Sequence, residues 1–230
     1  MIKLTPADLA RTYRDPVSWA ILAVDLIPIV AIFQFGWGAA AVVFLYWLEN
    51  LILGLVAIFR MGATSSVNGV SGLAGFVFLG AFFAFHYGMF CFVHGVFLMV
   101  FAAISTDGEM GGINPISLID YAFSTGNGMI WFVAAIAGLQ GFLFIRDFLM
   151  RGEFRETDVM AQMAEPYERV IVLHFALFAG AGLLVFLGDP LIGVLALILL
   201  RAGWGVVQSV RRQWEIADEP TAKVDEASPI

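Results

Sequence analysis

Several ionisable or metal-ligating side chains of this sequence lie inside long apolar stretches. The set comprises Asp25, Glu49, His86, His94, His174 and Arg201. On insertion scales, an ionised side chain at the centre of a membrane helix costs about 2.5–3.5 kcal/mol, so such residues usually have a partner and mark a functional site. All three histidines of the chain belong to the set, and none lies in a polar loop. These six residues are therefore the candidate site.

The histidines His86 and His94 cannot bind one metal ion by themselves. They are eight positions apart, which on an α-helix separates them by about 12 Å along the axis and about 80° around it. Metal–nitrogen bonds are about 2.0–2.1 Å long, so a shared ion needs ligands from other helices. Glu49 and His174 lie on different apolar stretches and supply such ligands. Cys91, three positions before His94, would add a soft sulfur ligand suited to copper.

The leading hypothesis is a metal or haem centre inside the membrane, with Glu49, His94 and His174 as ligands and His86 as a further ligand or proton relay. Two histidines and one carboxylate leave coordination positions open for water or substrate, which suits zinc hydrolysis or non-haem iron chemistry. A membrane metalloenzyme that uses zinc, iron, copper or haem is one form of this hypothesis. Arg201 would balance the charge of the site.

Two other interpretations use the same residues. A proton-coupled transporter or channel would employ the carboxylates, the histidines and Arg201 as a relay. A structural or assembly subunit would use them only for hydrogen bonds between helices, each worth about 0.6–2 kcal/mol. Counting about 1.5 Å per residue from the outer helix ends puts Arg201 at the depth of Asp25 and Glu49. We therefore expect Arg201 to form an ion pair with one of these two carboxylates.

The elements that carry these residues are predicted to be membrane helices. Hydrophobic residues make up 60% of the 230 and charged residues 13%, whereas soluble domains have about a quarter charged. A helix needs about 20 apolar residues to cross roughly 30 Å of hydrocarbon. The sequence predicts an all-α bundle of six transmembrane helices, at residues 17–35, 37–60, 72–103, 128–150, 167–187 and 190–211. The third is longer than a bilayer requires, so it must tilt or project beyond the membrane.

The basic residues indicate the orientation of the bundle, because cytoplasmic loops carry an excess of Lys and Arg. Lys and Arg residues occur in residues 1–16, around the connection between the fourth and fifth helices and after the sixth helix. The segment Ser105–Asn127 instead contains Asp107, Glu109 and Asp120 and no Lys or Arg. The pattern predicts that both termini are cytoplasmic.

Composition and the terminal segments narrow the partners. Residues 1–16 are predicted to form an interfacial segment with a helix start at Thr5-Pro6-Ala7-Asp8, and residues 212–230 a disordered cytoplasmic tail. The absence of a basic stripe argues against nucleic acid. The single cysteine, Cys91, excludes an internal disulfide and any four-cysteine metal site. The lipid bilayer is the partner that the sequence identifies, and it names no protein partner or oligomeric state.

Four groups of short motifs contain most of these polar residues. They are Tyr46-Trp47-Leu48-Glu49-Asn50, Phe85-His86-Tyr87-Gly88 with Val93-His94-Gly95, Glu165-Pro166-Tyr167 with Leu173-His174, and Leu187-Gly188-Asp189-Pro190. On these motifs the sequence resembles a bacterial membrane family known as domain of unknown function 6498, from about Trp37 to Arg201. The resemblance implies the fold and the location, a bacterial inner membrane, but no reaction, because that family is uncharacterised. It also implies a positive charge at Arg201, where members of the family often have lysine.

Overall fold

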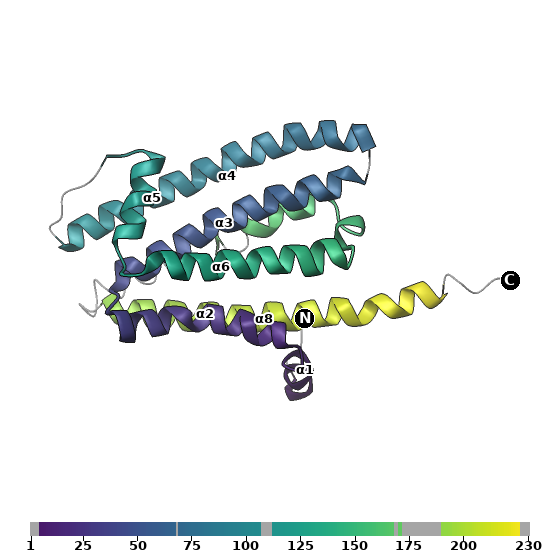
Figure 1. Cartoon of the computed structure of the whole chain (residues 1–230), viewed down its shortest axis with the longest axis horizontal. Helices are drawn as coiled ribbons and strands as arrows, with labels where there is room; N and C mark the ends of the chain where they lie inside the picture. The colour runs from purple at the N-terminus through teal and green to yellow at the C-terminus, as the bar shows by residue number, and fades with distance from the viewer. Residues whose placement is uncertain (1–4, 68, 107–111, 168–169, 172–189, 226–230) are drawn as a thin grey trace. The chain divides into compact units, whose positions relative to one another are not determined.

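The computed structural model describes residues 5–67, 69–106, 112–167, 170–171 and 190–225 (Figure 1). Every regular element in these residues is a helix, as the sequence predicts. The chain divides into two compact units, one formed by residues 1–30 with 195–230 and the other by residues 31–194. The helices of each unit pack mainly against one another.

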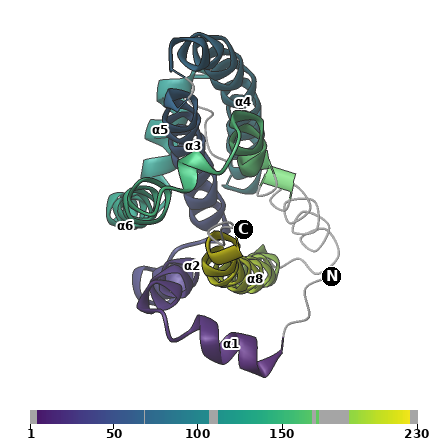
Figure 2. The same ribbon diagram turned by 90° about the vertical axis from the view of Figure 1, so that its right-hand side faces the viewer.

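The first unit contains α1 (Pro6–Thr12), most of α2 (Pro16–Phe35) and most of α8 (Pro190–Asp225). Thr5 begins α1 as predicted, because its hydroxyl accepts a hydrogen bond from the Asp8 N–H while the Asp8 carboxylate accepts one from the Thr5 N–H. This reciprocal capping satisfies two backbone donors at the start of the helix. Figure 2 shows α1 crossing the direction of α2 and α8.

The helices α2 and α8 run antiparallel. Asp15 at the start of α2 contacts Arg212 in the second half of α8, whereas Asp25 in the middle of α2 contacts Arg201, eleven residues earlier in α8. Both views of the ribbon show the two helices side by side (Figures 1 and 2). We call this contact the α2–α8 seam.

The second unit is built on the antiparallel pair α3 (Ala39–Ser66) and α4 (Gly69–Thr106). Gly54 allows the two helices to approach closely, since a Cβ at this position would lie 2.5 Å from Cε1 of Tyr87. The Tyr87 hydroxyl donates a hydrogen bond to the backbone carbonyl of Asn50 at 3.0 Å. Helix approach through small residues and interhelical hydrogen bonds is typical of membrane bundles, where burial of apolar surface supplies little attraction.

A second close approach lies further along the same helices. A Cβ at Gly95 would lie 2.7 Å from Cζ2 of Trp47, and the Trp47 indole N–H donates to the Cys91 carbonyl at 2.8 Å. The side chain of Cys91 itself is buried in the core. In the described structure Cys91 thus packs as a small core residue, which is its commonest use.

The other elements of the second unit pack against α3 and α4. Its elements are the short helix α5 (Pro115–Ser124), α6 (Met129–Leu143), the π-helix η1 (Phe144–Met150), the 3-10 turn η2 (Glu153–Arg155) and helical residues 159–167 and 170–171. The core between α3, α4 and the last of these segments is formed by Ala57, Met61, Phe83, Tyr87, Cys91 and Val170. The π-helix continues α6 directly, so the two together form one span.

Four described helices are long and apolar enough to cross a membrane, at Pro16–Phe35, Ala39–Ser66, Gly69–Val100 and Met129–Met150. They coincide with the first four predicted spans to within a few residues at most ends. The third predicted span is indeed over-long, because α4 has 38 residues. The chain is therefore an α-helical, membrane-embedded protein.

The other predicted segments compare as follows. The fifth span, 167–187, lies almost entirely outside the described residues. The sixth, 190–211, falls on α8, which is not one of the four helices above. A disordered tail was expected from residue 212, but α8 continues to Asp225. The polar character of the segment suggested disorder. Residues 212–219 are nevertheless rich in Arg, Gln, Glu and Ala, which favour a helix.

Candidate functional site

The central feature of the first unit is an ion pair in the middle of α2. Both Nε and Nη2 of Arg201 donate to Oδ1 of Asp25 at 3.3 Å. The Asp25 residue is 8% exposed, and it is the tenth residue of the 20-residue candidate span Pro16–Phe35. Arg201 thus forms an ion pair with Asp25, one of the two carboxylates at its predicted depth.

A glycine on α8 creates the space for this carboxylate. Gly205 lies one turn after Arg201, and a Cβ at this position would overlap Oδ2 of Asp25. Oδ1 therefore faces the guanidinium, while Oδ2 lies against the backbone of α8. Any larger residue at 205 would displace Asp25 or separate the helices.

A second ion pair closes the other end of the α2–α8 seam. Oδ2 of Asp15 accepts hydrogen bonds from Nη2 of Arg212 at 3.0 Å and from Nε2 of Gln213 at 3.1 Å. Its Oδ1 accepts from the Val17 N–H at 3.0 Å, so Asp15 also caps α2. The Ser18 hydroxyl contacts the same Nη2 at 3.4 Å. Both carboxylates of this seam are therefore held by arginines.

The sequence analysis did not include Asp15 and Arg212 among the candidate residues, because both lie at the ends of the apolar stretches. A signal was nevertheless present. At about 100° per residue, Arg201, Gly205 and Arg212 fall within about 40° of one another on α8. A stripe of two arginines and a glycine on one face of an apolar helix indicates a polar partner on the neighbouring helix.

Tyr13 lies between α1 and α2, just outside the candidate span Pro16–Phe35. Its ring packs edge to face against Trp19 with centroids 5.0 Å apart, and the Trp19 indole donates to the Tyr13 carbonyl at 2.9 Å. Burial raises the pKa of the Tyr13 phenol above its ordinary value, and the negative charge of Asp25 raises it further. The charge of Asp25 is thus the second cause of the raised Tyr13 pKa, after burial.

The residues of the predicted metal site lie in the second unit. Glu49 is 2% exposed and lies on the buried face of α3. The His86 ring is exposed, stacks on Phe82 with centroids 5.5 Å apart, and is 6.0 Å from the Tyr167 ring. His94 is half-buried, with its ring 5.3 Å from that of Phe90.

These residues do not form a metal-binding group in the part of the chain that the structure describes. No three side chains of the types His, Cys, Asp and Glu gather there in a way that would hold an ion. His174, the fourth expected ligand, lies outside the described residues. A site that combines Glu49, His94 and His174 with His86 nearby therefore stays a prediction.

Comparison with known proteins agrees with the motifs of this chain. A family model matches residues 7–222, and its description is a family of unknown function, DUF6498. The chain belongs to this family. A search of curated proteins and a search of solved structures each return no match. DUF6498 membership thus covers both ion pairs and the buried Glu49, and it assigns none of them a reaction.

Proposed function

We propose that this protein moves protons across the membrane, and that Asp25 is the group that takes up and releases the proton. The observation that carries the proposal is the ion pair between Asp25 and Arg201 in the middle of a candidate span. Ionisable residues at this depth are rare, and they commonly form proton relays in pumps and transporters. A bundle held together only by packing and neutral hydrogen bonds would not need a charged pair in this position.

Protonation of Asp25 would change the seam directly. A proton that arrives from one side of the membrane binds a carboxylate oxygen, and the neutral carboxyl no longer balances the Arg201 guanidinium. Removing one partner of a buried ion pair costs about 3–5 kcal/mol, so this state favours a movement of α8 that changes the surroundings of Arg201. Release of the proton to the other side restores the pair and completes the transfer.

A proline next to this group supports a moving seam. Pro28 is buried inside α2, and it has no N–H to donate to the carbonyl of Val24, four residues earlier. That carbonyl belongs to the residue that precedes Asp25. Helices bend at such positions, and water can bond a carbonyl that has lost its helical donor. Both effects would act within one turn of the proposed proton carrier.

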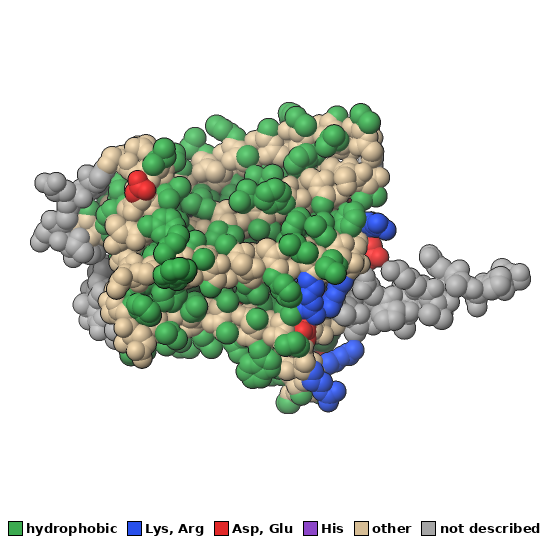
Figure 3. Space-filling model, in the orientation of Figure 1, with side chains coloured by type: hydrophobic (Ala, Val, Ile, Leu, Met, Phe, Trp, Pro, Cys, Tyr) green, Lys and Arg blue, Asp and Glu red, His purple; other side chains and the backbone are tan. Residues whose placement is uncertain are grey.

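The proposal includes six spans with both termini in the cytoplasm of a bacterial inner membrane. In the second unit, the basic side chains seen in Figure 3 gather beyond the end of α6, whereas the surface along the spans is mostly apolar. This distribution supports a cytoplasmic location for that end. Reporter fusions at Gly62, Arg151 and the C-terminus are expected to report cytoplasm. A periplasmic C-terminus would contradict the topology.

Purified protein reconstituted into vesicles that contain a pH-sensitive dye tests the function. After an imposed pH jump, vesicles with the wild-type protein are expected to equilibrate protons faster than protein-free vesicles. Asp25→Asn is expected to reduce this rate to the protein-free rate, because the amide cannot take up the proton. Asp120→Asn is the matched control, since it makes the same chemical change on an exposed residue of α5.

Two results would contradict the proposal. One is a wild-type rate equal to that of protein-free vesicles across the pH range. The other is an Asp25→Asn rate equal to the wild-type rate. Circular dichroism and size-exclusion chromatography check that each variant is folded, and Asp25→Glu, which retains a carboxylate, is expected to recover part of the flux.

The metal or haem centre is the second candidate. The observation in its favour is that Glu49 is 2% exposed inside a candidate span. If it exists, purified protein contains near-stoichiometric zinc, iron, copper or haem, and His94→Ala or His174→Ala releases it from a folded protein. Metal-free protein that conducts protons would favour the seam instead.

A further inference from the structure

The short helix α5 lies across the direction of α3 and α6, near the starts of both helices, instead of running along them (Figure 1). Asn114 begins it, with a side chain that accepts a hydrogen bond from the Ser117 N–H at 3.0 Å, and Pro115 occupies the first turn. Leu118 and Ala122 form its buried face. The helix is thus a defined element of the second unit, in contact with α3, α4 and α6.

Contacts of α5 fix its depth relative to the spans. The Tyr121 ring packs against the ring of Phe44 with centroids 5.3 Å apart. Phe44 is the sixth residue of α3, so it lies about 8 Å along the axis from Ala39. The interfacial zone of a bilayer adds about 10–15 Å in total to a hydrocarbon core of about 30 Å. A helix at this level lies where headgroups meet acyl chains.

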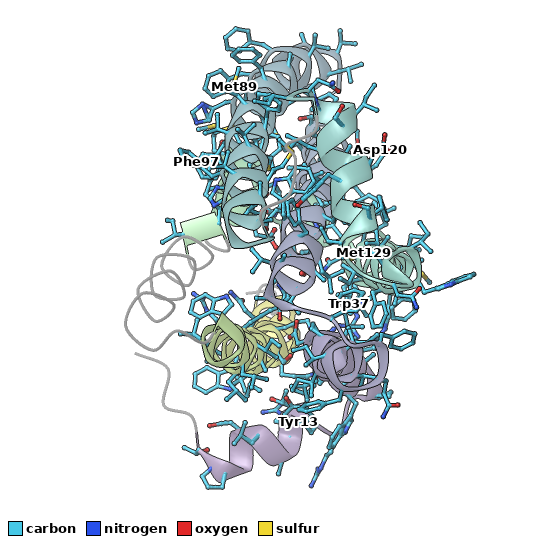
Figure 4. The ribbon with its side chains drawn as sticks, turned by 90° about the vertical axis from the view of Figure 1, so that its left-hand side faces the viewer. Tyr13, Trp37, Met89, Phe97, Asp120 and Met129 are labelled. Carbon is cyan, nitrogen blue, oxygen red and sulfur yellow. The ribbon has the colours of Figure 1, made fainter. Side chains whose placement is uncertain are left out.

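The two flanks of α5 differ in polarity. At about 100° per residue, each flank described here spans about 60°. One flank is apolar and consists of Ile116, Ile119 and Phe123. The other is polar and consists of Ser117, Asp120 and Ser124. Figure 4 shows Asp120 on the side of α5 that faces away from α3 and α4. The buried face is therefore bordered by an apolar flank and a polar flank, as in helices that lie in the membrane interface.

Two residues of the apolar flank, Ile116 and Ile119, are exposed, and Phe123 is half-buried. Ile116 is 72% exposed, and Ile113, just before the helix, is 57% exposed. At the start of α6, Ile130 and Trp131 are also largely exposed. Tryptophan is enriched where a span enters the headgroup region. The exposed side chains of α5 thus extend the apolar surface that the spans present to lipid.

We propose that α5 is an interfacial helix that inserts its Ile116, Ile119 and Phe123 flank among the lipid acyl chains of the leaflet around the start of α3. Asp120 on the other flank lies at the headgroups and the water. Lipid is the occupant because the flank, like the start of the membrane span α6, exposes large apolar side chains, and because it lies at the interfacial depth. The inference is independent of the proton pathway, since it uses no residue of the α2–α8 seam.

Site-directed fluorescence tests this placement in the full chain. Single cysteines are introduced at Ile116 or Ile119, with Asp120→Cys as the matched control, in a Cys91→Ala background, and they carry a polarity-sensitive fluorophore. The protein is reconstituted into phosphatidylethanolamine–phosphatidylglycerol vesicles. Labels at 116 and 119 are expected to be quenched several-fold more by nitroxide lipids than by aqueous iodide, and the label at 120 the reverse. If Cys91→Ala does not fold, labelling proceeds with Cys91 present, because this thiol is buried.

Two results would overturn the inference. Equal iodide quenching at 116 and 120 would mean that the flank faces water. Shielding of the labels at 116 and 119 from both quenchers would mean that protein covers the flank. Recovery of nitroxide quenching on dilution into excess lipid would then identify the covering protein as a second copy of this chain.

Discussion

Oδ2 of Asp25 occupies the position that a Cβ at Gly205 would need. The Asp25 carboxylate therefore lies directly against the α8 backbone. In this position its Oδ1 is 3.3 Å from Nε and 3.3 Å from Nη2 of Arg201. Glycine in a helix is usually unfavourable by about 0.5–1 kcal/mol relative to alanine. Glycine is needed at position 205 because the Asp25 carboxylate comes so close to the α8 backbone there.

Gly205→Ala is accordingly expected to destabilise the protein, because the new methyl group displaces Asp25. Overpacking of this kind costs about 1–3 kcal/mol, and the gain in helix propensity offsets only part of it. Gly203→Ala is the matched control on the same helix, since nothing lies within 4 Å of its Cβ. It is expected to raise the thermal unfolding midpoint slightly or leave it unchanged. A lower midpoint for Gly203→Ala than for Gly205→Ala would contradict this account.

A double-mutant cycle tests the ion pair. Arg201→Gln alone leaves the Asp25 carboxylate without its guanidinium and is expected to cost about 3–5 kcal/mol of stability. The double variant Asp25→Asn with Arg201→Gln is expected to lose less than Arg201→Gln alone, because the charge of Asp25 is removed together with its guanidinium. Arg201→Lys keeps the positive charge and is expected to lose least. Denaturant unfolding of the purified variants measures the coupling, and additive losses would mean that the two residues act independently.

Close packing of α3 on α4 gives a third prediction. Gly95→Ala would bring its methyl group to 2.7 Å from the Trp47 ring and disturb the indole hydrogen bond to Cys91. We expect a loss of about 1–3 kcal/mol from overpacking. The control is Gly88→Ala on the same helix, where nothing lies within 4 Å of the Cβ. Equal unfolding midpoints for the two variants would show that the ring moves aside freely.

The stability of helix α1 is expected to depend on pH, because its capping box contains the carboxylate of Asp8. The hydrogen bond from the Thr5 hydroxyl is the main reason that the pKa of Asp8 lies below its ordinary value of 3.8. A lowered pKa means that the ionised carboxylate stabilises the helix start above that ordinary value, and that this effect is lost as the pH falls through the lowered pKa. Thr5→Val is expected to raise the Asp8 pKa. Carboxyl-carbon NMR measures it, and an unchanged titration would contradict the role of Thr5.

The sequence was sufficient to predict features that depend on the local run of residue types, namely the membrane spans and one helix start. Apolar runs located four spans to within a few residues at most ends, and the Thr5-Pro6 pattern located the start of α1. Depth counting selected Asp25 as one of two partners for Arg201, because an arginine in hydrocarbon needs a carboxylate at its own level. It did not find α5, although Asn114-Pro115 is a helix start and Leu118 and Ala122 are spaced as one face.

The direction of each side chain around its helix was harder to predict. In α4, Phe83, Tyr87, Cys91 and Gly95 recur every four residues and face α3. His86 precedes Tyr87 by one position, about 100° around the helix, and it is exposed. Which face of an almost uniformly apolar helix is buried depends on small residues such as Gly54 on the partner. The sequence therefore placed the histidines at a depth but not at a common point.

Tyr13 offers a direct measurement of the charge on Asp25. Burial is the main reason that the pKa of Tyr13 exceeds its ordinary value of 10.0, and the negative charge of Asp25 is the second. Asp25→Asn removes only the second cause, so the Tyr13 pKa is expected to fall but to stay above 10.0. Asp120→Asn, which removes a carboxylate from α5, is expected to leave it unchanged. Ring-carbon NMR of labelled tyrosine, assigned with Tyr13→Phe, follows the titration. An unchanged Tyr13 pKa in Asp25→Asn would mean that Asp25 carries no net charge near Tyr13, which would remove the ion pair on which the proton pathway rests.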